Sequence, residues 1–290
     1  MLVKGTTRVC GVMADPVAHS LSPVLHNYMA EQMGIDFIYV PFRVDVRRVE
    51  EVLKGAYEMN LLGMNATVPH KQAILPYLKE IDRGAADIGA VNTLVRMEGG
   101  YKGYNTDLPG IKRALADAGV TQFAGREAVV VGAGGAARAV VYLLAREGMS
   151  RIWLLNRTLA RAEEMAGHVN GIFGEGLVVP LRTDCWRQIP AGKYLVIQAT
   201  SVGMYPCVEE APVEDPAFYR LIDVAMDIIY TPAKTKFMKY AMEAGAEAYN
   251  GLRMLLYQGV EAFELWTGQT VPAEVSEGAY CLMERMLEQS

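Results

Sequence analysis

The sequence predicts an α/β protein of two domains, each built on a mostly parallel sheet. In the first third of the chain, strand-like runs rich in β-branched and aromatic residues alternate with amphipathic helical runs. That alternation is typical of a parallel sheet covered by helices. Near residue 108 the pattern starts again, with a glycine cluster between a short strand and a helix. At 290 residues the chain is long enough for two domains of ordinary size.

The first domain is expected to begin with three strands and two helices. Runs rich in β-branched and aromatic residues predict strands over 8–14, 36–44 and 62–68. Between them, apolar residues recur at helical spacing and predict helices over 22–34 and 46–60.

The second domain is expected to begin with a helix over 108–119 and a short apolar strand over 127–131. A glycine cluster, a helix that extends through Glu147 and a second strand over 151–156 follow. A strand, a crossover helix and a second strand make a βαβ unit. This block is therefore expected to fold as a domain of its own.

The chain ends in two long helical patterns, over 252–266 and 273–287, and no strand pattern follows them. We expect these helices to pack back on the first domain. The predicted domains are therefore residues 1–107 plus about 252–290, and about 108–251.

Composition and charge narrow the classes of molecule that the protein is expected to bind. The net charge is −5 and the 28 basic residues are scattered, so neither a nucleic acid nor a membrane is expected as a partner. No apolar run approaches the roughly 18 residues of a membrane helix, and the N-terminus lacks a signal-peptide core. The cysteines have no metal-ligand spacing, so no metal site and no disulfide framework is expected. We expect reduced, buried thiols in a cytoplasmic protein at Cys10, Cys185, Cys207 and Cys281.

The glycine cluster has the form of a dinucleotide-binding motif. Gly132, Gly134 and Ala137 make a GxGxxA pattern between an apolar strand and an amphipathic helix. In this context the backbone turns tightly and approaches a pyrophosphate, which then meets the N–H groups at the helix N-terminus. The pattern predicts a Rossmann domain. The alternative is a glycine-rich turn without a ligand.

The end of the second strand favours NADP over NAD. A protein that prefers NAD usually places a carboxylate here for the ribose hydroxyl. This chain instead has donors and positive charge at Asn156, Arg157, Thr158 and Arg161. Such a set suits a 2′-phosphate, and Glu163 and Glu164 come too late to take the acidic role. In the alternative interpretation, Thr158 caps a helix and the arginines are solvated.

Two serines near the N-terminus are candidates for binding a carboxylate. Ser20 and Ser22 are two residues apart, so in an extended segment both hydroxyls point the same way, and Pro23 then begins a helix. The alternative is that Ser22 is an ordinary N-cap. His19 and His26 are expected to be structural partners of backbone groups.

The stretch "ATVPHK" brings Thr67 to the end of a strand and Lys71 into the first turn of a helix. Ligands bind at the carboxyl ends of strands in α/β proteins. A lysine is electrostatically unfavourable at a helix N-terminus, which indicates a partner or a task for Lys71. Asp107 in "GYNTD" is a candidate partner. The alternatives are a solvated Lys71 and an Asp107 that only caps the next helix.

Nine motifs together carry a family resemblance. In order they are "HSLSP", "NATVPHK", "GAVNT", "GYNTD", "GAGGAARA", "NRT", "ATSVGM", "IIYTP" and "GLRMLLYQGVEAFELWTG". Their order and spacing resemble the shikimate dehydrogenase family, which includes the quinate/shikimate dehydrogenases. The resemblance extends from Arg8 to about Pro272.

The resemblance implies an NADP-dependent oxidoreductase that reduces 3-dehydroshikimate to shikimate, a step toward aromatic amino acids. It implies that Lys71 and Asp107 are the catalytic pair. The substrate carboxylate would be bound by Ser20, Ser22 and Tyr230. The ring oxygens would contact Thr67, Lys71, Asn92, Asp107 and Gln258. Besides the NRT segment and Arg161, the cofactor would be bound by Gly132, Ala133, Gly134, Gly135, Ala136, Thr200 and Gly251.

The sequence departs from the usual family pattern at Ala66, His70, Leu108, Pro109, Gln198, Thr231 and Arg253. These departures remove no catalytic group, and they leave quinate open as a substrate. An NAD-linked quinate/shikimate dehydrogenase is the nearest alternative, and the arginines of the NRT segment oppose it. A noncatalytic NADP-sensing or ligand-binding relative is the other, and the Lys71–Asp107 pair opposes it. The chain is expected to act as a monomer or homodimer.

Overall fold

The computed structural model describes residues 2–18 and 20–289. The chain forms two compact units. Unit 1 comprises Met1–Gly110 and Leu255–Ser290, and unit 2 comprises Ile111–Met254. The chain is an α/β protein in which each unit has a six-stranded sheet. The predicted fold class is confirmed.

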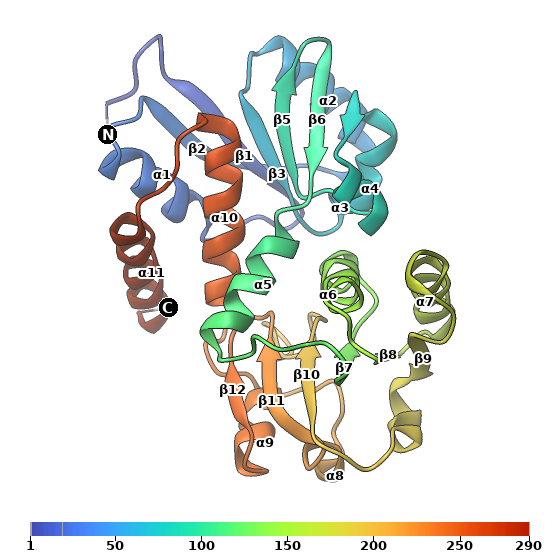
Figure 1. The fold of residues 1–290 in the computed structure, drawn as a ribbon. Helices are drawn as coiled ribbons and strands as arrows, with labels where there is room; N and C mark the ends of the chain where they lie inside the picture. Colours follow the sequence, from blue (N-terminus) through green and yellow to red (C-terminus); the bar gives the residue numbers. More distant parts are fainter. Residues whose placement is uncertain (1, 19, 290) are drawn as a thin grey trace. The chain divides into compact units, whose positions relative to one another are not determined.

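Unit 1 has a mixed sheet with a parallel half. Its strands, in the order in which they lie side by side, are β2 (Phe37–Arg43), β1 (Arg8–Ala14), β3 (Gly63–Ala66), β5 (Thr93–Met97), β6 (Gly100–Tyr104) and β4 (Glu80–Ile81). β1 pairs in parallel with β2 and β3, and β4 pairs in parallel with β6. β5 pairs antiparallel with β3 and β6 (Figure 1). The β5–β6 hairpin is absent from the expectations above. Gly99 turns it with φ 78°, so the "EGG" turn was the available signal.

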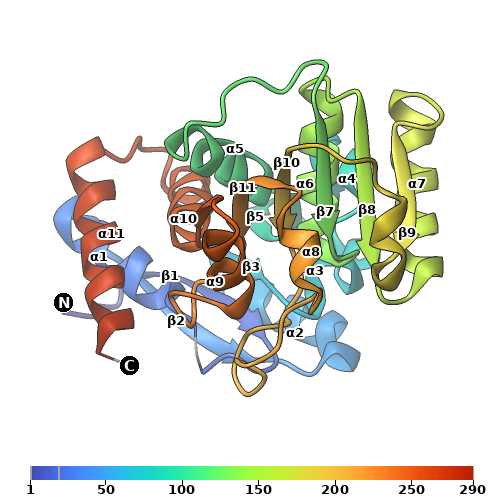
Figure 2. The same cartoon turned by 90° about the horizontal axis from the view of Figure 1, so that it is seen from below.

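The helices of unit 1 come from both ends of the chain. They are α1 (Ser22–Gln32), α2 (Val49–Glu58), α3 (His70–Ala73), α4 (Arg83–Ile88), α11 (Ala273–Glu288) and most of α10 (Leu252–Thr267), with the 3₁₀ turns η1 (Val46–Arg48) and η2 (Leu75–Tyr77). α11 lies beside α1, as both views of the ribbon show (Figures 1 and 2). α5 (Asp107–Asp117) and α10 each contain a point where the chain passes from one unit to the other.

Trp266 of α10 joins the C-terminal segment to the first sheet. Its indole N–H donates to the carbonyl of Leu94 at 2.8 Å. A Cβ on Gly63 would lie 2.1 Å from that indole nitrogen, so only glycine admits the ring here. The rings of His26 and Tyr39 pack around the indole, with centroids 5.2 and 5.8 Å away. The core of unit 1 is therefore complete only with the last helices of the chain.

Unit 2 has an all-parallel sheet in the strand order of a Rossmann fold. The strands, side by side, are β12 (Glu247–Tyr249), β11 (Ile222–Asp227), β10 (Tyr194–Gln198), β7 (Glu127–Val131), β8 (Arg151–Asn156) and β9 (Val178–Arg182). The helices are α6 (Gly135–Arg146), α7 (Leu159–Phe173), α8 (Pro216–Tyr219) and α9 (Lys236–Glu243), with the 3₁₀ turn η3 (Thr183–Gln188). The strands predicted over 127–131 and 151–156 are confirmed as β7 and β8.

Alternation along β7 explains how the sheet of unit 2 is covered. Val129 and Val131 share a core with Phe218 of α8 and Phe237 of α9. Val130 is also fully buried and points to the opposite face, where α6 packs on β7 and α7 on β8 and β9. A strand buried on both faces reads as a continuous apolar run, which is why "AVVV" was a clear signal.

Three further features of the chain concern its helix lengths, its possible metal ligands and its cysteines. Within residues 2–18 and 20–289, no helix has the length and apolar character needed to cross a membrane. The same residues contain no cluster of three or more side chains that could hold a metal ion. All four cysteines are free. The expectation of buried thiols is correct for Cys10 and wrong for Cys207 and Cys281, which are exposed.

Asp227, at the end of β11, is a buried carboxyl group that gives a testable pH dependence. Its two oxygens accept from the Ile229 N–H at 2.9 Å and the Thr235 hydroxyl at 2.6 Å. Burial raises the pKa of Asp227 from 3.8 to about 7, although both hydrogen bonds oppose the rise. Between these pH values the folded state holds a proton that the unfolded state has lost. The native state therefore loses stability as the pH rises through this window.

We expect Asp227→Asn to abolish this loss, because the amide cannot ionise and keeps an oxygen for the Ile229 N–H. Relative to the unaltered protein, the free energy of unfolding of the variant should increase by up to about 1.4 kcal/mol for each unit by which the pH rises toward 7. The gain should level off above that pH. Urea unfolding from pH 5 to pH 8 measures it, with Asp223→Asn, at an exposed position of the same strand, as the control. A difference that stays constant with pH would contradict this account.

Candidate functional site

Lys71 and Asp107 form a largely buried ion pair in unit 1. The Lys71 ammonium donates a hydrogen bond to Oδ2 of Asp107. The two side chains are only 13% and 6% exposed. Lys71 is held by α3, which begins after the turn in which the His70 N–H donates to the Thr67 carbonyl at 2.7 Å. The alternative of a solvated lysine is therefore wrong.

Asp107 is the first residue of α5, but its carboxylate does not serve as a helix cap. The nearby N–H of Leu108 donates to Oδ1 of Asn105, at 3.3 Å. Both Asp107 oxygens are instead used by side chains, one by Lys71 and the other by Asn92. The alternative in which Asp107 only caps α5 is wrong as well.

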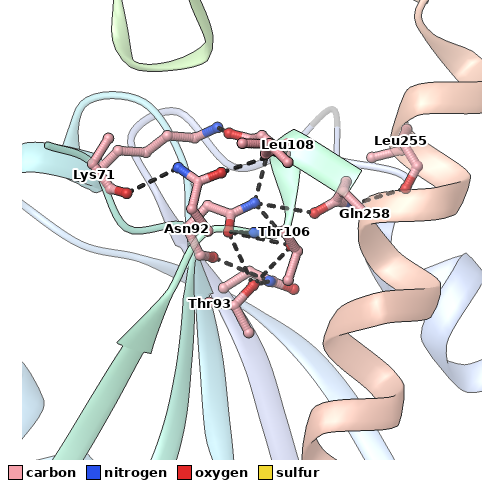
Figure 3. Close-up of polar contacts among 11 residues, drawn as sticks. Lys71, Asn92, Thr93, Thr106, Leu108, Leu255 and Gln258 are labelled. Atoms are coloured by element: carbon pink, nitrogen blue, oxygen red, sulfur yellow. Dashed lines mark hydrogen bonds and ion pairs between the residues drawn. The ribbon is translucent and has the colours of Figure 1, made fainter. Parts of the chain in front are cut away.

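Asn92, just before β5, connects Asp107 to the rest of a buried network. Its Nδ2 donates to Asp107 Oδ1 at 2.9 Å and lies 3.5 Å from Oε1 of Gln258 on α10. Its Oδ1 accepts from the backbone N–H of Thr106 at 2.8 Å. Because a backbone donor faces Oδ1, the amide group must face the carboxylate. Figure 3 shows Lys71, Asn92 and Gln258 converging from three segments of unit 1.

Sequence reasoning did not predict the members of this network that lie within the sheet of unit 1. Asn65, inside β3, donates to the Thr93 hydroxyl at 2.9 Å and to the Asn92 carbonyl at 3.1 Å. Its Oδ1 accepts from the Tyr39 hydroxyl at 2.6 Å. The Thr93 hydroxyl in turn donates to Oδ1 of Asn92 at 3.1 Å. An asparagine in the middle of a buried strand needs partners, and that was the available signal.

The segment with the two serines is not extended. Leu21 is helical, with φ −83° and ψ −6°, and α1 begins at Ser22 with Leu21 as its N-cap and no side-chain cap bond. Both the extended geometry and the Ser22 cap are therefore wrong. The Ser22 N–H lies 3.3 Å from the Ser20 Oγ that accepts its hydrogen bond. Burial raises the pKa of the Tyr39 phenol, and the nearby Ser22 hydroxyl opposes part of that rise.

The structure describes two histidines of unit 1, His26 and His70, and both are buried. His19 lies outside the described residues. His26 is fully buried and its ring stacks on Tyr39 with centroids 4.2 Å apart. Among the described residues, no backbone group bonds either ring nitrogen, so the expected backbone role is wrong. Burial lowers the pKa of His26 to about 3, with Asn65 opposing part of the fall. His70 is also buried, which lowers its pKa and fits a neutral ring.

The glycine motif of unit 2 has the shape that a pyrophosphate site requires. Gly132 has φ 115°, and a Cβ there would lie 2.7 Å from the Ala199 carbonyl oxygen and 2.8 Å from Cγ2 of Thr200. Only glycine fits this turn. Gly134 is the exposed N-cap of α6 and provides no side-chain cap, so the first N–H groups of α6 are left for a ligand. These residues fit a bound dinucleotide. Ala133, Gly135 and Ala136 are all half-buried at the same turn.

The segment after β8 is exposed. Asn156 ends β8, and its Nδ2 donates to the Thr158 carbonyl at 2.8 Å. Thr158 is the N-cap of α7, but its side chain makes no cap bond, so the capping part of that alternative is wrong. Arg157 and Arg161 are exposed, and no ion pair joins either to an acid among the described residues. Glu164, also on α7, accepts from Arg138 of α6 at 2.6 Å.

The remaining predicted residues of unit 2 follow the strands β10, β11 and β12. Thr200 follows β10, where its N–H donates to Gln198 Oε1 at 2.5 Å and its Oγ1 accepts from Val202 at 3.1 Å. The Gly251 N–H donates to the Ile229 carbonyl at 3.0 Å. Tyr230 follows β11 and is half-buried.

Known proteins resemble the chain over most of its length. Three family descriptions match: the shikimate dehydrogenase substrate binding domain over 12–94, the shikimate/quinate 5-dehydrogenase over 114–181, and the shikimate 5′-dehydrogenase C-terminal domain over 251–277. The shikimate dehydrogenase (NADP(+)) of Moorella thermoacetica is 43% identical over 279 residues, which cover 95% of this chain and 93% of the relative. The chain belongs to the shikimate dehydrogenase family.

Solved structures of the shikimate dehydrogenase family support the same assignment. One shikimate dehydrogenase in complex with NADP⁺ matches with a TM-score of 0.86 and 36% identity, covering 97% of both chains. The enzyme from Thermus thermophilus, in complex with NADP(H) and shikimate, matches with a TM-score of 0.82 and 33% identity, covering 95% of this chain and 99% of that one.

Proposed function

We propose that the chain is an NADP-dependent shikimate dehydrogenase, which interconverts 3-dehydroshikimate and shikimate. The observation that carries the proposal is the largely buried Lys71–Asp107 pair, which Asn92 holds in place. Relatives in the family are named for this activity. A protein that only binds a ligand has no need of a proton donor fixed in this way. The resemblance and the geometry thus support the same chemistry.

Lys71 acts as the general acid at the carbonyl oxygen of the substrate. Bound NADPH supplies the hydride. As the oxygen becomes an alkoxide, the Lys71 ammonium stabilises the negative charge and donates a proton to it. Asp107 orients the ammonium, and Asn92 holds the carboxylate from its other side. In the oxidation of shikimate the same lysine takes the hydroxyl proton.

The substrate is bound by hydroxyl and amide groups that the family resemblance indicates. Ser20, Ser22 and Tyr230 bind the carboxylate, and Thr67, Asn92 and Gln258 contact the ring oxygens. The side-chain oxygen of Gln258 lies near Asn92, and its side-chain nitrogen donates to the Leu255 carbonyl at 2.9 Å. These two contacts support a fixed orientation of the Gln258 amide. A rigid set of donors of this kind selects a polyhydroxylated ring acid.

The cofactor is bound by the turn at Gly132 and the N-terminus of α6. Ala133, Gly134, Gly135 and Ala136 would hold the phosphates through their backbone, and Thr200 and Gly251 would also bind the cofactor. Asn156, Arg157, Thr158 and Arg161 bind the 2′-phosphate that distinguishes NADP. The protein acts in the cytoplasm on a small molecule, as a monomer or homodimer.

A matrix of substrates and cofactors tests the proposal. We expect kcat/KM, measured from NADPH absorbance, to be highest for shikimate with NADP, and lower by at least about tenfold when NAD or quinate replaces one component. A higher kcat/KM with quinate and NAD would point instead to the quinate-linked alternative. Binding of NADP and shikimate without turnover would point to a noncatalytic relative.

A further inference from the structure

Unit 2 contains a cavity of about 410 Å³ beside the segment assigned to the 2′-phosphate. Arg157, Arg182, Asp184, Trp186 and Val213 are among the residues that line it. It lies at the carboxyl ends of two neighbouring strands, since Arg157 follows β8 and Arg182 ends β9. In a Rossmann fold, this end of the second strand is where the adenosine ribose binds.

The strand register brings Arg182 next to the NRT segment. Asn156 and Arg182 are direct partners in the β8–β9 pairing, and neighbouring parallel strands lie only about 4.8 Å apart. Arg182 and Arg157 therefore line the same cavity from adjacent strand ends. Sequence distance hid this proximity, because the two arginines lie 25 positions apart along the chain.

Arg182 already binds an anionic group. Its Nε donates to Asp184 Oδ1 at 3.0 Å, and its Nη2 donates to the other carboxylate oxygen. The two side chains are 57% and 59% exposed. Water screens such an exposed pair, so the pair adds little to stability and can be exchanged for a stronger anion. A phosphate dianion presents more acceptors to the guanidinium fork than one carboxylate.

We propose that Arg182 is a specificity-determining residue for NADP, and that Asp184 competes with the adenosine 2′-phosphate for its guanidinium group. Without the phosphate, Asp184 neutralises Arg182. With it, the guanidinium releases the carboxylate and joins Arg157 on the phosphate. The inference rests on the proposed use of NADP and adds to it a residue that neither the motif nor the resemblance indicated.

The test measures binding of two nucleotides to the full-length protein by calorimetry. Adenosine 2′,5′-bisphosphate carries the 2′-phosphate, and adenosine 5′-monophosphate lacks it. We expect Arg182→Met to weaken the bisphosphate about tenfold and to leave the monophosphate unchanged, since the methionine keeps the apolar stem. Asp184→Asn should tighten the bisphosphate about threefold, because the competing charge is removed.

Arg187→Met is the matched control. Arg187 lines the same cavity, is also exposed and is also paired with an acid, Asp215. It lies in η3, however, and not at the strand end that pairs with Asn156. This control should leave both affinities within about twofold. An equal loss in the Arg182 and Arg187 variants would show a general charge effect and overturn the inference. So would equal losses for the two nucleotides, or an Asp184→Asn variant with weaker bisphosphate binding.

The same data separate this inference from the cofactor assignment. If the unaltered protein binds both nucleotides equally, the assignment to NADP fails and the role of Arg182 fails with it. If the unaltered protein prefers the bisphosphate and Arg182→Met keeps that preference in full, only the inference about Arg182 is overturned.

Discussion

Replacing Lys71 by methionine is expected to lower kcat by about 10²–10⁴-fold, with a smaller change in KM. The nascent alkoxide then loses both its proton donor and the nearby positive charge. Asp107→Asn should lower kcat similarly, because the amide no longer holds the ammonium in place. The double variant should be hardly slower than either single variant, since the two groups act as a unit. Steady-state kinetics on the three variants measures this.

Stability should follow a different pattern from kcat in the same variants. Lys71→Met leaves the Asp107 carboxylate buried without its cation, which is strongly destabilising. Adding Asp107→Asn removes that charge, so the double variant should regain stability without regaining turnover. Lys54→Met, which breaks an exposed pair with Glu50 in the same unit, is the control. Near-normal turnover in a folded Lys71→Met protein would end the proposed mechanism.

The second large effect is expected at the 2′-phosphate site. Replacing both Arg157 and Arg161 by methionine should weaken NADP binding by about 10²–10⁴-fold and leave NAD binding nearly unchanged. Each charge-assisted hydrogen bond to the phosphate is worth about 1.5–3 kcal/mol, and 1.4 kcal/mol is tenfold in affinity. Because both arginines are exposed and have no ion pair with an acid among the described residues, their removal should leave unit 2 folded.

Fluorescence titration with each cofactor measures the change in affinity. Arg146→Met, at the exposed C-terminal end of α6, removes a comparable charge from the same unit and serves as the control. If NADP and NAD lose affinity equally, the arginines do not read the 2′-phosphate and the preference for NADP has another source.

The sequence by itself was sufficient for the features that local chemistry determines. The apolar run at 127–131, the glycines at 132 and 134 and the helix after them specify one βαβ unit, because a turn that tight excludes any side chain at Gly132. Motif order was sufficient for the family. Lys71 and Asp107 could be predicted to form a pair because both lie in such motifs.

Only the tertiary structure decided how the polar groups are satisfied. Asn65, Thr93 and Tyr39 come from three strands, and their hydrogen bonds depend on sheet order and register, which no local pattern encodes. The β5–β6 hairpin brings Asn92 within 3.0 Å of the Tyr104 carbonyl, and so next to Asp107.

The same reason explains the errors at the serines and the omission of Arg182. Leu21 adopts a helical conformation that a local reading of "SLSP" does not reveal. Arg182 adjoins Asn156 only through the pairing of β8 with β9. Burial and strand pairing join residues far apart in the chain, whereas local periodicity reports only on neighbours a few residues away. The sequence therefore determined which elements form and which family the chain belongs to, and the packing of those elements decided which side chains meet.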